Sequence, residues 1–183
     1  MLTKNRMKVL IMGAAGAGTT TLAGALAKVL DGRHLDADDY YWEPTDPPYQ
    51  RKRDKASRNQ ALQADFLAQA PTIVSGSLFS WGPFWPTAFD LIVFLYLPPT
   101  LRMQRLRARE YDRYGDALTQ DPILRQQSRD FLAWAEQYDS PTFTGRSYRL
   151  HQEWLSEVDC PVLRLTGDLT VAERVERVVQ YLG

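Results

Sequence analysis

The sequence has little of three features that define other classes of protein. It contains one cysteine, Cys160, so an intramolecular disulfide is excluded and a reducing compartment, the cytoplasm, is expected. Its longest apolar run, residues 91–97, is far shorter than the roughly 20 residues of a membrane span. It has no net charge, with 22 basic and 22 acidic residues, which disfavours a nucleic-acid partner. We therefore expect a globular protein with neither membrane nor nucleic-acid partner.

The pattern of the 183 residues predicts one α/β domain, covering 1–183. Short apolar runs predict strands at residues 8–12, 33–36, 72–75, 90–96 and 161–165. Helices are expected at 20–30, 54–69, 99–110, 121–138 and 146–157, and a capping box of Thr170 and Glu173 predicts a terminal helix. Strands that are apolar throughout and alternate with helices predict a five-stranded parallel sheet with helices on both faces.

A glycine-rich segment lies between the first predicted strand and the first predicted helix. It follows the phosphate-loop pattern of glycine, four residues, glycine, lysine and serine or threonine, except that Thr19 stands at the lysine position. Glycine lets the backbone curl until several N–H groups point at one phosphate, and the helix dipole adds to that attraction. The candidate nucleotide-binding residues here are Gly13, Ala14, Ala15, Gly16, Ala17, Gly18, Thr19, Thr20 and Thr21.

The missing lysine separates binding from catalysis. A lysine at this position normally follows the terminal phosphates and offsets the charge that develops during transfer. With Thr19 in its place, we still expect the loop to bind phosphate, but the sequence does not decide whether the protein catalyses phosphoryl transfer. Lys52 or Arg53 could supply the cation instead.

The loop, the order of strands and the arginines downstream together resemble the small-molecule and nucleoside monophosphate kinases of the P-loop class, such as adenylate, shikimate and gluconate kinases. This resemblance implies a three-layer αβα P-loop NTPase fold that uses ATP and Mg²⁺. It also implies a substrate-binding insertion at about 37–70 and a lid at about 110–122. The likeness covers the order of elements along nearly the whole chain and is specific only at short motifs.

The run 36–39 ends the second predicted strand and is similar to the Asp-x-Asp motif of shikimate kinase-like enzymes. Carried over, Asp36 would assist a Mg²⁺ site built on Thr20, and Asp38 would orient or deprotonate the acceptor. The alternative is a solvated acidic turn that caps a helix. Ser75 departs from the aspartate of adenylate kinase-like enzymes, so metal binding would depend more on Thr20 and Asp36.

Arginines are expected to approach the nucleotide from the second half of the chain. By the resemblance, Arg105 would stack on adenine and Arg109 would contact phosphates; their four-residue spacing places them on one helix face, which Arg102 shares. Arg149 would return to the phosphates from beyond the lid, and Gly167 and Asp168 would meet the adenine edge. The alternative is an ordinary basic, solvated surface.

Aromatic and cationic residues in 40–58, with a second aromatic group in 76–89, are expected to define the phosphate acceptor; the candidates are Asp38, Tyr41, Arg53, Arg58, Gly76 and Ser77. They suit an acceptor with a ring and an anionic group, such as a nucleoside monophosphate, although they could simply pack a subdomain. The sequence thus predicts an ATP-dependent kinase of a small acceptor, as a monomer or homodimer. The alternative is a nucleotide-binding regulator with little turnover.

Overall fold

The computed structural model describes residues 6–46, 48–68 and 70–183. Residues 1–5 of the predicted domain and Gln69 of the predicted helix 54–69 lie outside this range, as does Pro47. The strands are β1 (Lys8–Gly13), β2 (Arg33–Asp36), β3 (Thr72–Ser75), β4 (Leu91–Tyr96) and β5 (Val162–Thr166). The helices are α1 (Thr19–Val29), α2 (Ala37–Tyr41), α3 (Lys55–Phe66), α4 (Pro99–Tyr114), α5 (Ala117–Gln120), α6 (Pro122–Glu136), α7 (Tyr148–Leu155) and α8 (Val171–Leu182), with 3₁₀ turns η2 (Trp85–Thr87) and η3 (Gln137–Asp139).

The five strands form one parallel sheet in the order β2-β3-β1-β4-β5. All the carboxyl ends therefore meet at one edge, and the central strand β1 delivers the glycine-rich segment there. The predicted strands are confirmed to within about two residues. The three-layer αβα P-loop fold is confirmed as well.

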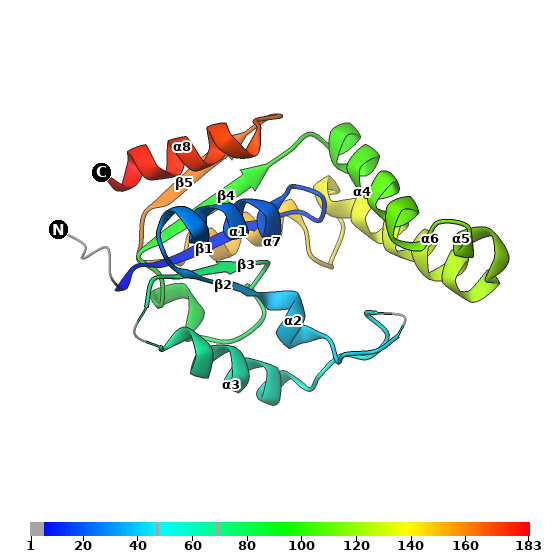
Figure 1. Ribbon diagram of the computed structural model, residues 1–183, viewed down its shortest axis with the longest axis horizontal. Helices are drawn as coiled ribbons and strands as arrows, with labels where there is room; N and C mark the ends of the chain where they lie inside the picture. Colours follow the sequence, from blue (N-terminus) through cyan, green and yellow to red (C-terminus); the bar gives the residue numbers. More distant parts are fainter. Residues whose placement is uncertain (1–5, 47, 69) are drawn as a thin grey trace.

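Alternate residues of the strands face opposite layers of helices, which explains why the strands are apolar throughout. Val9 and Ile11 of β1 pack in one core with α1 and α8, whereas Leu10 and Met12 pack in a second core with α3 and α7. Figure 1 shows α8 running along β5 on one side of the sheet and α3 on the other. Two cores on either side hold β1, and with it the loop that follows, in a fixed position.

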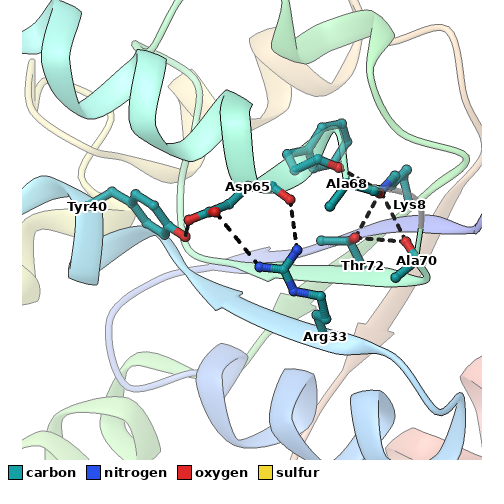
Figure 2. Close-up of polar contacts among 8 residues, drawn as sticks. Lys8, Arg33, Tyr40, Asp65, Ala68, Ala70 and Thr72 are labelled. Atoms are coloured by element: carbon teal, nitrogen blue, oxygen red, sulfur yellow. Dashed lines mark hydrogen bonds and ion pairs between the residues drawn. The ribbon is translucent and has the colours of Figure 1, made fainter.

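Polar contacts tie α3 to the start of the central strand β1 and to α2 (Figure 2). The Lys8 ammonium group donates to the carbonyls of Phe66, Ala68 and Ala70 at 2.6, 2.9 and 3.1 Å, just where α3 ends. The positive charge of Lys8 also interacts favourably with the negative, C-terminal end of the helix dipole. The Tyr40 hydroxyl donates to Asp65 at 2.6 Å, which fastens α2 to α3.

Three helices, which we call the lid helices (α4, α5 and α6), project together from the carboxyl edge of the sheet (Figure 1). The segment 111–120, for which the sequence predicted no helix, is helical through Tyr114 and again in α5. The buried Glu110 carboxylate accepts from Ser128 of α6 at 2.8 Å, and this buried polar contact holds the pair together. No helix in the described part of the chain is long and apolar enough to span a membrane.

Candidate active site

The backbone of the phosphate loop (residues 13–20) requires glycine at three positions. Gly16 and Gly18 have φ angles of +83° and +91°, a backbone conformation that residues with a side chain rarely adopt. A β-carbon on Gly13 would lie 2.6 Å from the carbonyl oxygen of Leu95. Helix α1 starts immediately afterwards at Thr19, so its free N–H groups face the curled loop. The loop therefore has the form of an anion cradle that side chains would fill.

Two oxygen ligands for a divalent cation lie together at the edge of this cradle. The Thr20 hydroxyl donates to the Asp36 carboxylate at 2.8 Å, which joins α1 to the end of β2. Among the described residues, no cluster of three or more His, Cys, Asp or Glu could hold a metal alone. A hydroxyl and a carboxylate suit Mg²⁺, which takes its remaining ligands from water and substrate phosphates. The residues therefore fit a Mg²⁺ ion that accompanies a nucleotide.

A cavity of about 880 Å³ opens above the phosphate loop and extends between the lid helices and the segment that follows β2. It collects most of the site residues that the sequence predicted: Gly13, Ala14, Ala15, Gly16, Gly18, Thr19, Thr20, Thr21, Asp36, Asp38, Tyr41, Gly76, Ser77, Arg105 and Arg109. Lys52, Trp81 and Arg146 line it too. Phosphate-binding backbone, carboxylates and cations thus share one space.

Asp38 stands between acidic and basic neighbours in this cavity. Asp36 caps α2 by accepting from the Asp38 backbone N–H at 3.0 Å, so the acidic turn is both a helix cap and part of the cavity wall. The Asp38 carboxylate still reaches the solvent of the cavity, but the walls reduce its hydration and raise its pKa. The charges of Arg146 and Arg109 act in the opposite direction. A carboxyl group tuned this way can accept a proton or orient a hydroxyl.

Arg105 lies where the predicted adenine-binding elements meet. Its guanidinium forms an ion pair with Asp168, in the loop after β5. Gly167, with a φ of +91°, donates its N–H to the Tyr96 carbonyl at 3.0 Å and so fixes this loop against β4. Gly167 and Asp168 border the cavity through this contact with Arg105 and do not line it in the described structure.

A buried arginine that the sequence interpretation missed braces the phosphate loop. Arg174 of α8 is only 4% exposed, and its Nη1 donates to the carbonyl oxygen of Ala17 at 2.8 Å. Burial lowers its pKa, and the charge of Arg105 adds to that effect while Asp168 opposes it. Ala17 therefore contributes to the site through this backbone contact. No local pattern signals a contact between residues so far apart in sequence.

Three predicted substrate or phosphate ligands lie away from the cavity in the described structure. Arg58 is buried with its guanidinium over the rings of Tyr41 and Trp81, at 4.2 and 5.0 Å, where it supports the aromatic wall. Arg53 is held by its backbone N–H, which donates to the Tyr41 carbonyl at 2.9 Å. Arg149 forms an exposed ion pair with Glu153, one turn along α7.

The described structure differs from the expectation for two arginine positions: Arg146, and not Arg149, reaches the cavity, and Arg102 does not share the face of Arg105 and Arg109. Helix α7 starts after its cap at Ser147, so Arg146 precedes the helix and reaches the cavity, with its guanidinium 5.5 Å from the Trp134 ring. Arg102 does not share the accessible face of α4. It is fully buried, over the Tyr138 ring and paired with Asp139, so it has a structural role.

A second cavity of about 320 Å³ adjoins the first and shares with it Asp38, Trp42, Arg109 and Phe131. The side-chain amides of Gln50 and Gln127 exchange two hydrogen bonds, of 2.8 and 3.2 Å, across it. These bonds connect the loop after α2 to α6. The second cavity is thus partly closed by contacts between the loop after α2 and the lid helices.

Comparison with known proteins agrees with this architecture. The sequence matches a family described as an AAA domain over residues 9–126. A Bacillus subtilis (strain 168) protein described as uncharacterized, YqaC, is 41% identical over 173 residues, which are 94% of this chain and 96% of that protein.

Several solved structures share the fold at low identity. Shikimate kinase from Acinetobacter baumannii in complex with shikimate has a TM-score of 0.53 and 17% identity, over 98% of this chain and 94% of that one. Shikimate kinase from Aquifex aeolicus vf5 gives 0.55 and 14%, over 96% of each chain. A gluconokinase from Sinorhizobium meliloti 1021 gives 0.50 and 14%, over 98% and 97%. These likenesses show a common fold.

Proposed function

This chain belongs to the AAA-domain family, and we propose that it is a kinase that transfers the γ-phosphoryl group of ATP to a small acceptor. One observation carries the proposal: the cavity above the phosphate loop also contains Asp38 and the arginines Arg105, Arg109 and Arg146. A protein that only held a nucleotide would need the cradle, but not a carboxyl group facing free space beside it. The kinase folds of the similar structures support the same conclusion.

In the proposed reaction, an acceptor hydroxyl attacks the γ-phosphorus of ATP. The bond to the oxygen that bridges the β- and γ-phosphorus breaks, and ADP leaves with that oxygen. Asp38 holds the hydroxyl in line and takes up its proton. Because its pKa is raised, Asp38 is a stronger base than an ordinary aspartate. Catalysis of this kind depends on positioning and on compensation of charge.

Charge compensation would come from several elements. The phosphate-loop N–H groups hold the β- and γ-phosphates, while Arg109 and Arg146 face the transferred group from α4 and from the residue before the α7 cap. Thr20 and Asp36 would hold Mg²⁺, which offsets phosphate charge when bound. Arg105 would stack on the adenine, next to the loop of Gly167 and Asp168.

The acceptor is proposed to be a nucleoside monophosphate or a similar small anionic metabolite. The cavity wall also contains Tyr41, Trp42 and Trp81, and Lys52 lies 5.8 Å from the rings of Tyr41 and Trp42. Rings beside cations suit a flat or puckered ring that carries a negative charge. Because the similar folds include shikimate kinase and gluconokinase, hydroxy acids belong among the acceptors to be tested.

The test is ATP turnover with a panel of nucleosides, nucleotides, sugars, sugar acids and hydroxy acids, shikimate and gluconate included. We expect one class to be phosphorylated and Asp38→Asn to lower kcat about 100-fold or more, because general-base contributions are of that size. Asp39→Asn is the matched control, since the neighbouring Asp39 does not line the cavity in the described structure. Equal loss in both variants would remove Asp38 from its proposed role.

The alternative, a nucleotide-binding regulator, is favoured by one observation, which is Thr19 at the lysine position. It predicts tight ATP binding and no phosphorylated product with any acceptor of the panel. Under this alternative, Thr19→Lys would leave ATP affinity unchanged. Under the kinase proposal, the added cation lies in the phosphate cavity and strengthens ATP binding.

A further inference from the structure

A chain of three buried side chains leads from the cavity wall into the core. Ser77 follows Gly76 at the end of β3, lines the larger cavity and is 6% exposed. Its hydroxyl lies 2.8 Å from Nε2 of His151, and Nδ1 of the same ring lies 2.8 Å from the Tyr138 hydroxyl. His151 is completely buried and Tyr138 is 3% exposed. The proposed phosphoryl transfer makes no use of His151 or Tyr138.

The ring of His151 is held in its neutral form by its surroundings. The aromatic rings of Phe79, Phe94 and Tyr138 lie 5.9, 6.2 and 5.4 Å from it. Burial lowers the pKa of His151 to about 3, and the nearby Arg146 charge acts in the same direction. A neutral imidazole carries one N–H, so one ring nitrogen donates a hydrogen bond and the other accepts one.

The hydrogen-bond partners decide which nitrogen carries the hydrogen. If Nδ1 donated to Tyr138, the buried phenol hydrogen would need another acceptor, and the described residues offer none. If instead the Tyr138 hydroxyl donates to Nδ1, every buried hydrogen is satisfied and Nε2–H donates to the oxygen of Ser77. Since Ser77 then accepts from His151, its own hydrogen is left for the cavity.

We propose that Ser77 is a directed hydrogen-bond donor to the phosphate acceptor, and that Tyr138 and His151 are positioning residues that fix this direction. The proposal rests on the kinase function proposed above and adds a rule of selectivity to it. A donor at this point of the wall selects an acceptor that presents a carboxylate, phosphate or carbonyl oxygen to Ser77. Arg146 lines the same cavity and favours a charged oxygen.

The first test measures the tautomer of His151 without any ligand. The chain has two histidines, so ¹⁵N-histidine labelling gives two rings, and His34→Gln assigns them. We expect hydrogen on Nε2 and a bare Nδ1 for His151 at neutral pH, and a shift toward the Nδ1–H form in Tyr138→Phe, which removes the fixing donor. A wild-type ring with hydrogen on Nδ1 would overturn the proposal, because the Ser77 hydroxyl would then donate to His151.

The second test measures kinetics with the acceptor that is phosphorylated in the panel. Ser77→Ala is expected to raise the acceptor KM about 3- to 10-fold for an acceptor that presents a carbonyl oxygen and about 10- to 150-fold for one that presents a charged oxygen, with the ATP KM unchanged. Tyr138→Phe should act through the same hydroxyl, so the double variant should cost no more than Ser77→Ala alone. Additive losses, or equal effects on both substrates, would contradict the proposal.

Tyr40→Phe is the matched control for the loss of a phenol. Tyr40 also donates its hydroxyl within the structure, to Asp65 on α3, but it does not line the cavity in the described chain (Figure 2). The Tyr40→Phe variant should leave the His151 tautomer and the acceptor KM unchanged. If no acceptor is phosphorylated, the kinase proposal fails, while the tautomer measurement still decides whether Ser77 donates into the cavity.

Discussion

Removal of the Arg174 guanidinium tests whether a residue outside the cavity shapes nucleotide binding. Arg174→Met keeps the apolar stem that packs under the loop and removes the group that bonds to the Ala17 carbonyl at 2.8 Å. The carbonyl lies in the phosphate loop, one residue before Gly18, whose φ of +91° the loop must maintain. Among the described residues, this hydrogen bond is the one contact in which a charged side chain of α8 holds the phosphate loop, and the variant loses it.

The size of the effect follows from the burial of the contact. A hydrogen bond from a charged donor is worth about 1.5–3 kcal/mol, and Arg174 is 4% exposed, so little of this is screened. If the full amount is lost from the nucleotide-bound state, the Kd for ATP rises about 10- to 150-fold, at about 1.4 kcal/mol for each factor of ten. The loss in the free protein lowers the free energy of unfolding instead.

Titration calorimetry with ATP and Mg²⁺, together with thermal unfolding, separates these two contributions. Arg177→Met is the control, because Arg177 is exposed on the same helix and should bind ATP like the wild type. A lowered melting temperature with an unchanged Kd would mean that Arg174 only supports the packing of α8. Unchanged values in both assays would refute the reasoning from the Ala17 contact.

Two other residues give predictions of different kinds. Gly76→Ala should destabilise the fold and abolish turnover, because φ is +114° and the new β-carbon would lie 2.8 Å from that of Ala37; unfolding curves and the acceptor panel measure both effects. The neutral His151 should make the protein less stable in acid. Its pKa is about 3 in the fold and about 6.5 unfolded, so stability is complete above 6.5 and falls by up to about 1.4 kcal/mol per pH unit below it. Urea unfolding from pH 7 to 5 should show a weaker pH dependence in His151→Gln, and an equal dependence in both proteins would contradict this assignment.

Much of the fold could be predicted because its signals are local. Apolar runs predicted the strands, and glycines at fixed spacing predicted the phosphate loop between β1 and α1. The two short helices α2 and α5 were missed, since polar runs of four or five residues have no amphipathic period to detect. Their positions depend on caps and on tertiary contacts such as that between Tyr40 and Asp65.

The site was predictable where the side chains follow directly from an element, and not where they depend on distant partners. Arg105 and Arg109 reach the cavity because their spacing on α4 determines their direction. Arg102 belongs to the same helix, but Asp139 and the Tyr138 ring, far along the chain, draw it into the core. Sequence spacing carries no information about such a partner.

The threonine at position 19 changes how the cavity must supply charge. In a phosphate loop that contains the lysine, the ammonium group and the backbone N–H groups that hold the phosphates belong to the same short segment. Here the cations that line the cavity come from separate elements: Lys52 from the segment between α2 and α3, Arg105 and Arg109 from α4, and Arg146 from the position just before the α7 cap. In the proposed reaction, compensation of the developing charge would therefore depend on how the segment between α2 and α3 and the lid helices approach each other. If the chain is the proposed kinase, the Gln50–Gln127 contact, which joins these two parts beside Asp38, affects the rate of transfer although neither glutamine lines the larger cavity in the described structure.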